Sequence, residues 1–161
     1  MPRKVFQEIL GQAVLSCVID GVLLSERVKQ VIVAVPDDLL HLELVNWLSI
    51  NHPRVDVFRG PEHDVLGRFV NALDAFNVPG DASVVRVTSD CPLINPIEID
   101  QIIYQFDVTG CDYLANTCPK PGSAIDGFDV EVFSAAALRR LGGNKDLTAN
   151  EKEHVTVGFL K

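Results

Sequence analysis

The sequence predicts an α/β fold with a doubly wound, mostly parallel sheet. Short apolar or β-branched runs alternate with segments of helical period along most of the 161 residues. The clearest runs are residues 31–35 and 84–88, and a segment with helical spacing of apolar residues follows each one. Continuous apolar runs of this length are typical of strands buried on both faces, as in parallel sheets.

The expected elements follow one another with short connections. Helices are expected at residues 13–24, 39–50, 65–76, 97–106 and 135–141, with a last amphipathic helix at 150–160. Strands are expected at 31–35, 55–58, 84–88, 111–115 and 128–133. Glu62 and Asp64 place negative charge at one helix start, and Ser134 is a typical N-cap for another.

The usual first strand of such folds is missing from this pattern. Doubly wound folds place a strand and a phosphate-binding turn before the first helix, whereas only residues 1–12 precede the helix here, without a glycine-rich turn. A missing central strand leaves main-chain groups and apolar surface uncovered. We therefore expect residues 3–10 to rearrange over the gap, or a second copy of the chain to cover it, so that the protein is a homo-oligomer.

Length, charge and cysteine content limit the class of protein. A chain of 161 residues with 47% apolar residues is expected to form one domain, residues 1–161. The 14 basic and 22 acidic residues give a net charge of −8 with no basic stripe, which argues against a nucleic-acid partner. No segment is long and apolar enough to cross a membrane. Four cysteines without a C-x-x-C pair are typical of a reduced, cytoplasmic protein.

Asp90 is the first candidate for a functional residue. It follows the β-branched run 84–88, Pro92 restricts Cys91 to extended geometry, and Pro96 suits the first position of a helix. A carboxylate is thus expected at the carboxyl end of a strand, where α/β proteins bind ligands. That position suits a metal ion that carries a nucleotide phosphate. The alternative, given equal weight on these residues alone, is a turn aspartate that binds its own backbone.

Four segments carry a resemblance to a known family. They are residues 58–69 (FRGPEHDVLGRF), 86–96 (RVTSDCPLINP), 126–134 (DGFDVEVFS) and 153–156 (EHVT). In collinear order over nearly the whole chain, they resemble the spore-coat polysaccharide branch of the acylneuraminate cytidylyltransferase family. The resemblance implies a Rossmann-like fold of the nucleotide-diphospho-sugar transferase type. It also implies that a sugar hydroxyl attacks the α-phosphorus of CTP while pyrophosphate leaves on Mg²⁺.

The resemblance also implies roles for individual residues. A carboxylate holds the cation in such a step, and basic groups neutralise phosphate oxygens. Asp90 would be the metal-binding and catalytic carboxylate, and Lys4 would be catalytic and bind phosphate. The further nucleotide-binding residues would be Arg3, Arg59, Arg68 and Arg86, and the sugar-binding residues would be Asp126, Asp129, Glu131, Glu153 and His154. The expected partners are CTP or a related nucleotide and a sugar.

Two departures from the family pattern lead us to expect a domain truncated at both ends. The chain begins inside the family's phosphate-binding loop, with Met1-Pro2-Arg3-Lys4 at its end, and it stops at Lys161, before the segment that carries the family's second metal carboxylate. We therefore expect an incomplete cytidylyltransferase that is weakly active or inactive. The alternative is a non-catalytic oligomeric or binding protein on the same scaffold, and a third is a flavodoxin-like regulatory domain that binds a small molecule.

Several candidate residues have a structural interpretation beside the functional one. Arg86 lies inside a β-run and would need a partner, so a paired structural arginine is as acceptable as a phosphate contact. Arg68 is spaced to pair with Asp64 one helical turn earlier. A terminal Lys4 is commonly solvated, and Glu153 and His154 are expected on adjacent faces of one exposed helix.

Overall fold

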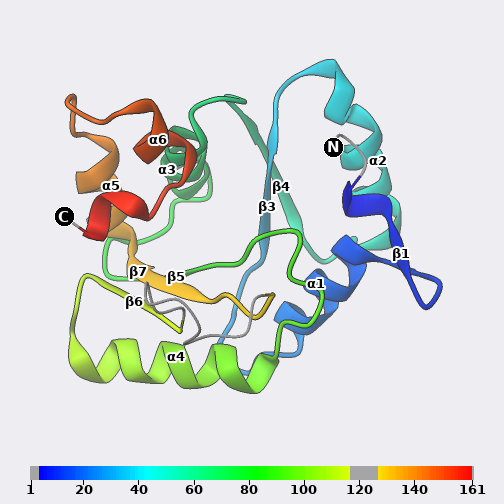
Figure 1. Cartoon of the computed structure of the whole chain (residues 1–161), viewed down its shortest axis with the longest axis horizontal. Helices are drawn as coiled ribbons and strands as arrows, with labels where there is room; N and C mark the ends of the chain where they lie inside the picture. Colours follow the sequence, from blue (N-terminus) through cyan, green and yellow to red (C-terminus); the bar gives the residue numbers. More distant parts are fainter. Residues whose placement is uncertain (1–3, 117–126, 161) are drawn as a thin grey trace. The chain divides into compact units, whose positions relative to one another are not determined.

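The computed structural model describes residues 4–116 and 127–160 and divides the chain into two compact units (Figure 1). Unit 1 is Met1–Val31 with Ser83–Phe133, and unit 2 is Ile32–Ala82 with Ser134–Lys161. Each unit thus combines two stretches that are far apart in the sequence.

Unit 1 is built on a three-stranded sheet in the order β5-β7-β6. The strands are β5 (Ser83–Arg86), β6 (Tyr113–Ala115) and β7 (Glu131–Ser134), and β6 runs antiparallel to β7 with Leu114 opposite Val132. Helix α4 (Pro96–Thr109) runs along this sheet (Figure 1). Its inward side chains pack against Val130 and Val132, which lie just before and within β7, to form the core. The buried members of this core are Ile94, Ile99, Ile102, Ile103, Phe106, Val130 and Val132.

Helix α4 begins at Pro96, which the sequence analysis placed at a helix start, and continues to Thr109, beyond the predicted end at Phe106. The side chain of Asn95 accepts a hydrogen bond from Ile97 N, Pro96 stands in the first turn, and Gly110 ends the helix at φ 64°. Asparagine at the N-cap, proline at the first helical position and left-handed glycine at the end are the residues these positions favour. The helix is therefore fixed locally at both ends, independently of its packing.

The segment before α1 (Val14–Leu23) differs from the expectation. Residues 4–6 form a short 3₁₀ helix, η1 (Lys4–Phe6), and β1 (Glu8–Ile9) pairs antiparallel with β2 (Gln12–Ala13) in a two-stranded sheet of its own. Leu10 and Gly11, at φ 52° and 84°, make the turn that allows this hairpin. The expectation that residues 3–10 fill a gap in the main sheet is therefore wrong for the described residues 4–10.

A close contact between α1 and the loop before α4 gives a first prediction. A Cβ on Gly21 would lie 2.6 Å from Ile94 Cγ2 and 3.0 Å from the Ile94 carbonyl oxygen. Because Ile94 is buried, we expect Gly21→Ala to lower the free energy of unfolding by about 1–3 kcal/mol, despite the better helix propensity of alanine. Urea unfolding measures this loss. The matched control is Gly80→Ala, whose Cβ makes only an ordinary contact with Ala136; an equal effect of both substitutions would contradict the packing argument.

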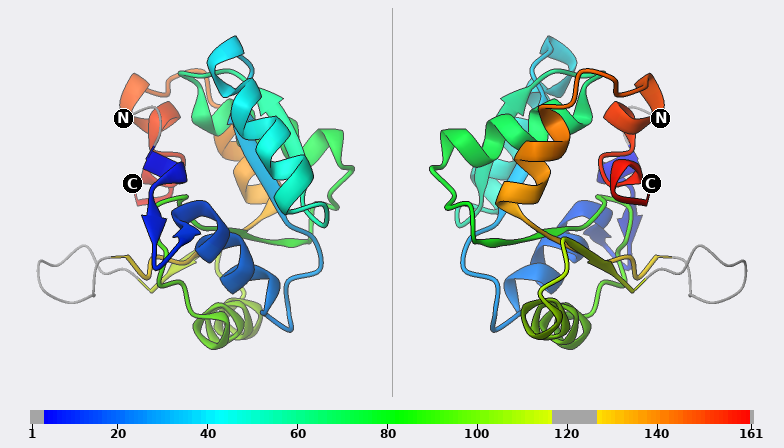
Figure 2. Two further views of the ribbon diagram at one scale, coloured as in Figure 1. Left: turned by 90° about the vertical axis from the view of Figure 1, so that its right-hand side faces the viewer. Right: turned by 90° about the vertical axis from the view of Figure 1, so that its left-hand side faces the viewer.

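Unit 2 is built on two parallel strands and their helices. Strand β3 (Ile32–Pro36) pairs parallel with β4 (Asp56–Gly60), and α2 (Leu42–Asn51), preceded by η2 (Leu39–His41), connects them. Figures 1 and 2 show α2 and α3 (Val65–Ala75) on opposite sides of this pair. Parallel strands joined by a helix are the unit expected of this fold class.

Three further elements complete unit 2. Helix α5 (Ala135–Gly142) begins at the predicted N-cap Ser134, whose side chain accepts a hydrogen bond from Ala137 N. Arg139 of α5 ties this helix to the end of α3 through Asp74 Oδ1 at 2.8 Å and the Val78 carbonyl oxygen at 2.9 Å. Helix α6 (Ala149–Glu153) and η3 (Val157–Leu160) follow.

The last of these segments corrects the prediction of one helix over 150–160. Helix α6 ends at Glu153, and Val155 adopts φ 50°, a left-handed conformation that cannot continue a helix. Val155 is fully buried, so burial of its side chain compensates for this backbone conformation. No helix of the described chain is long and apolar enough to cross a membrane.

Candidate active site

A polar cavity of about 290 Å³ in unit 1 brings together three of the predicted site residues. Its lining residues are Lys4, Thr88, Asp90, Cys91, Gly127 and Asp129. Lys4 belongs to η1, Thr88 to Cys91 follow β5, and Gly127 and Asp129 precede β7. Lys4, Asp90 and Asp129 are therefore neighbours although they come from three separate parts of the sequence.

The loop that carries Asp90 is a tight turn between β5 and α4. Cys91 N donates a hydrogen bond to the Thr88 carbonyl oxygen, and Ile94 N donates one to the Cys91 carbonyl oxygen. The Cys91 side chain is buried, with Sγ 3.0 Å from Thr88 Oγ1. These contacts fix the loop beneath Asp90, as the two prolines predicted, and leave its carboxylate at the cavity.

The charge of Asp90 is stabilised by its neighbours. The Lys4 ammonium donates a hydrogen bond to Asp90 Oδ2 at 2.6 Å. This hydrogen bond, followed by one from Thr88, holds the pKa of the Asp90 carboxyl below its ordinary value against the opposing effect of partial burial. The Asp90 side chain is still 44% exposed, so its ionised oxygens remain accessible to a ligand.

Arg86 and Glu131 form a separate, buried pair beside this loop. The Arg86 guanidinium on β5 binds Glu131 Oε2 on β7, and their side chains are only 18% and 12% exposed. Tyr113 on β6 donates its hydroxyl to Glu131 Oε1 at 2.9 Å. This geometry matches the interpretation of Arg86 as a paired structural arginine, and it shows the predicted sugar-binding Glu131 engaged by two neighbouring strands.

Tyr113 is the member of this cluster that the sequence reasoning missed. It stands in an expected strand, but nothing in its spacing from Glu131 indicates that the two side chains meet. The polar residue inside the β7 run was the available signal, because a buried carboxylate needs hydrogen-bond donors.

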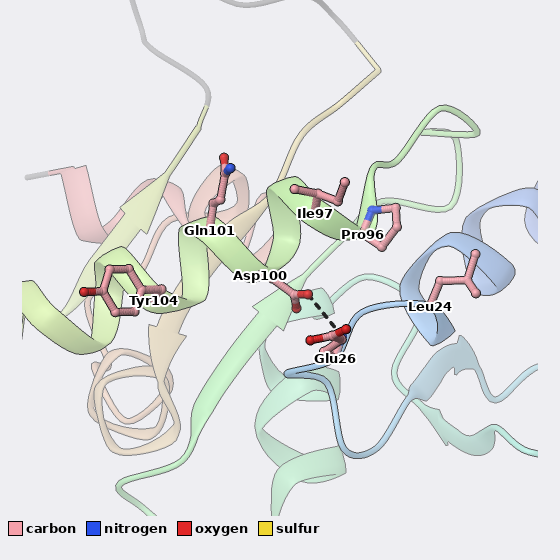
Figure 3. A pocket seen from close by; sticks show the side chains of 7 residues that line it. All are labelled: Leu24, Glu26, Pro96, Ile97, Asp100, Gln101 and Tyr104. Atoms are coloured by element: carbon pink, nitrogen blue, oxygen red, sulfur yellow. Dashed lines mark hydrogen bonds between the residues drawn. The ribbon is translucent and has the colours of Figure 1, made fainter.

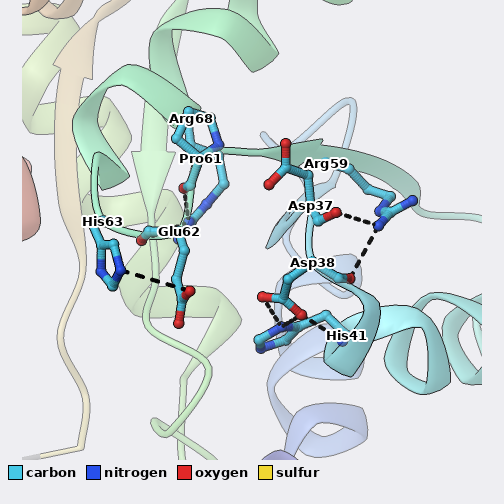
Figure 4. Close-up of polar contacts among 8 residues, drawn as sticks. All are labelled: Asp37, Asp38, His41, Arg59, Pro61, Glu62, His63 and Arg68. Atoms are coloured by element: carbon cyan, nitrogen blue, oxygen red, sulfur yellow. Dashed lines mark hydrogen bonds and ion pairs between the residues drawn. The ribbon is translucent and has the colours of Figure 1, made fainter.

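The predicted nucleotide-binding residues Arg59 and Arg68 lie in unit 2 (Figure 4). Arg59 Nη2 donates to the carbonyl oxygens of Asp37 and Asp38 at 2.7 and 3.1 Å. Arg68 Nη1 donates to the carbonyl oxygens of Pro61 and Glu62 at 2.5 and 3.3 Å. Both guanidinium groups therefore brace loops at the ends of β3 and β4, and their role in nucleotide binding stays a prediction.

The expected ion pair between Asp64 and Arg68 is wrong. Asp64 instead caps α3 by accepting a hydrogen bond from Gly67 N at 2.8 Å. Arg68 is buried, desolvation lowers the pKa of its guanidinium, and its Nε is buried without a hydrogen-bond partner in the described chain. Its long side chain covers Gly60, where an added Cβ would come within 3.0 Å of Arg68 Cγ.

Of the remaining candidate site residues, two lie in unit 2 and two lie outside the described residues. Glu153 ends α6 and His154 is its C-cap, both exposed in unit 2, so the expectation that they share one continuous helix is wrong. Arg3 and Asp126 lie outside the described residues, as does Cys118. The other cysteines, Cys17, Cys91 and Cys111, have free thiols.

A second cavity of unit 1, of about 410 Å³, lies between α4 and the loop after α1 (Figure 3). Its lining residues are Leu24, Glu26, Pro96, Ile97, Asp100, Gln101 and Tyr104. Burial opposes ionisation of Asp100, but hydrogen bonds from Ser25 Oγ, Glu26 N and Arg27 N together keep its pKa below the ordinary value. The Asp100 carboxylate thus holds the 25–27 loop, and this cavity brings together no catalytic set.

Comparison with known families identifies the family of this chain. The family model described as "Cytidylyltransferase" matches residues 1–143 of this chain. The chain belongs to the cytidylyltransferase family.

Two relatives of this cytidylyltransferase chain are longer than it. An uncharacterised protein of Methanocaldococcus jannaschii is 31% identical over 159 residues, which are 97% of this chain and 60% of that protein. A cytidylyltransferase of known structure from Leptospira borgpetersenii is 23% identical, with a TM-score of 0.85 over 98% of this chain and 63% of its own. The chain therefore spans about 60% of the length of these relatives.

Two further solved structures share the fold at lower identity. The CMP:2-keto-3-deoxy-manno-octonic acid synthetase in complex with CTP is 14% identical, with a TM-score of 0.69 over 99% of this chain and 78% of its own. A 4-diphosphocytidyl-2C-methyl-D-erythritol synthase is 15% identical, with a TM-score of 0.67 over 96% of this chain and 81% of its own. The predicted Rossmann-like fold of the nucleotide-diphospho-sugar transferase type is confirmed.

Proposed function

We propose that this chain binds a cytidine nucleotide with a divalent cation at the Asp90 cavity and transfers the nucleotide to a sugar for surface polysaccharide. The observation that carries the proposal is the meeting of Lys4, Asp90 and Asp129 around one polar cavity at the carboxyl end of β5. This is the edge at which open α/β sheets bind their ligands. Membership of the spore-coat branch rests on the four sequence segments.

The residues at the cavity fit a magnesium ion. Asp90 and Asp129 offer carboxylate oxygens and Thr88 a hydroxyl, which are the hard oxygen donors that Mg²⁺ prefers. The described residues contain no group of three or more His, Cys, Asp or Glu side chains that could hold a metal ion. Mg²⁺ is commonly held by one or two carboxylates together with the phosphates of its nucleotide, so two carboxylates suffice. A bound Mg²⁺ would neutralise charge on the phosphates and the leaving pyrophosphate.

Ligand-induced stabilisation tests the proposed nucleotide site. CTP with Mg²⁺, at about ten times its Kd, should raise Tm by roughly 3–6 °C, because a ligand that binds only the folded state stabilises it. Scanning fluorimetry with CTP, UTP, GTP and ATP measures the shift and the base preference. Asp90→Asn should lose the shift, and the exposed Asp81→Asn, its charge-matched control, should retain it. Absence of a shift with all four nucleotides at millimolar concentration would contradict the proposal.

A second experiment distinguishes the proposed transferase from the alternative, a binding protein without catalytic activity. We expect slow release of pyrophosphate from CTP when an acidic or modified sugar is supplied, and none without a sugar. Continuous detection of pyrophosphate with a panel of sugars measures this rate. Nucleotide binding with no pyrophosphate release from any sugar would favour the non-catalytic alternative.

Self-association remains a prediction, and the outer face of α4 supports it. Ile97, Tyr104 and Val108 stand on that face with 66%, 56% and 67% of their surfaces exposed, beside Leu24 at 71%. We expect a mass of at least two chains by size-exclusion chromatography with light scattering, and dissociation in the variant Tyr104→Lys. A monomeric mass for the unmodified chain at 100 µM, roughly the concentration at which weak dimers persist, would contradict this prediction.

A further inference from the structure

Lys4 and Asp90 form an ion pair that borders the cavity. Lys4 Nζ lies 2.6 Å from Asp90 Oδ2 across a sequence separation of 86 residues. The two side chains are 54% and 44% exposed. Exposed ion pairs contribute little to folding stability, so this contact can break without unfolding the loop that carries it.

The pair competes with any cation that binds Asp90. The ammonium group occupies an oxygen of the carboxylate that a divalent cation would use. Two cations within about 4 Å of each other repel even in water, so the ammonium weakens the binding of a metal ion to the same carboxylate. The cavity lining carries one positive and two negative side chains, 1 − 2 = −1, and this small net charge attracts a free divalent cation weakly.

We propose that Lys4 is the resident counter-ion of Asp90 and makes cation binding depend on the nucleotide. This inference rests on the proposed function. Without a nucleotide, the Lys4 ammonium neutralises Asp90 and opposes a free divalent cation. With a nucleotide, the phosphate oxygens supply new acceptors for the displaced ammonium, whose flexible four-carbon stem allows it to move. Cation and nucleotide then bind together, and the cation alone binds poorly.

The substitution Lys4→Gln tests this coupling, because it removes the charge while keeping a long polar side chain. We expect Mn²⁺ alone to bind the variant roughly three- to tenfold more tightly than the unmodified chain, since a neighbouring positive charge is lost. We expect Mn²⁺ with CTP to bind the variant roughly tenfold more weakly, since a phosphate contact is lost. Electron paramagnetic resonance of free Mn²⁺, with and without CTP, measures both.

Two controls make the result specific. Lys29→Gln removes the same charge at an exposed position of unit 1 outside the cavity, and it should change neither affinity. Asp90→Asn should weaken Mn²⁺ binding both with and without CTP. Circular dichroism of each variant verifies that it is folded.

The outcomes separate the counter-ion role from the proposed function. If the Lys4→Gln variant binds Mn²⁺ alone no more tightly than the unmodified chain does, the counter-ion role is overturned. If Lys4→Gln binds Mn²⁺ more tightly but neither the variant nor the unmodified chain binds CTP, the counter-ion role is supported and the proposed nucleotide site is overturned. Opposite changes of the two affinities support both.

Discussion

Replacing Glu131 by alanine should lower the free energy of unfolding by about 3–5 kcal/mol, the largest stability effect expected for this chain. The substitution leaves the Arg86 guanidinium without its partner in a position where only 18% of the side chain is exposed. It also removes the hydrogen bond that the part-buried Tyr113 hydroxyl donates to Glu131, and this lost bond adds to the loss. Urea unfolding followed by circular dichroism measures the change.

The double variant Arg86→Met/Glu131→Leu is the matched test of this explanation. Replacing both members of a buried ion pair by apolar residues of similar volume is commonly neutral or stabilising, because no buried charge is left unpaired. We therefore expect the double variant to regain most of the stability that Glu131→Ala loses. If the double variant is as unstable as Glu131→Ala, the loss arises from packing and not from the orphaned charge.

Asp90→Asn should lower the rate of pyrophosphate release from CTP by about 100-fold or more, the largest effect expected on activity. Loss of one electrostatic contact to the transition state typically costs this factor, and the amide is a much weaker ligand for a divalent cation than the carboxylate. Single-turnover measurement of pyrophosphate release compares the variant with the unmodified chain under saturating CTP.

The fold of Asp90→Asn needs a separate check, since its loop is tightly hydrogen bonded. The backbone hydrogen bonds of this loop, from Cys91 N to the Thr88 carbonyl oxygen and from Ile94 N to the Cys91 carbonyl oxygen, do not involve the carboxylate. An asparagine oxygen can still accept the Thr88 hydrogen bond, and the Lys4 ion pair is exposed, so we expect the variant to keep its stability within about 1 kcal/mol. Asp81→Asn should leave the rate unchanged. A rate loss in Asp90→Asn no larger than in Asp81→Asn would contradict the assignment of Asp90.

Local chemistry explains which parts of the fold were predictable. Helix α4 has a proline in its first turn and a left-handed glycine at its end, and α5 has its serine cap, so both are recognisable from sequence. The Leu10-Gly11 turn and the break at Val155 depend on positive φ angles, two of them at non-glycine residues that the sequence pattern does not mark. For that reason, the expectation that residues 3–10 fill the gap is wrong for the described residues 4–10, and so is the expectation of one helix over 150–160.

The site was predictable where its geometry is local. Asp90 stands in a turn set by neighbouring residues, and its place at the end of β5 follows from them. Arg86 and Glu131 are 45 residues apart, and they meet only because β7 lies between β5 and β6 in the sheet. The order of strands cannot be obtained from the spacing of residues, so neither this pair nor the part played by Tyr113 could be derived.

The most direct test of the Asp90 site is calorimetric titration of CTP, in the presence of Mg²⁺, into the unmodified chain and into Asp90→Asn. We expect one nucleotide per chain with a measurable Kd for the unmodified protein, and binding at least tenfold weaker for the variant. Equal affinity of the two proteins for CTP with Mg²⁺ would show that nucleotide binding does not depend on the carboxylate at position 90.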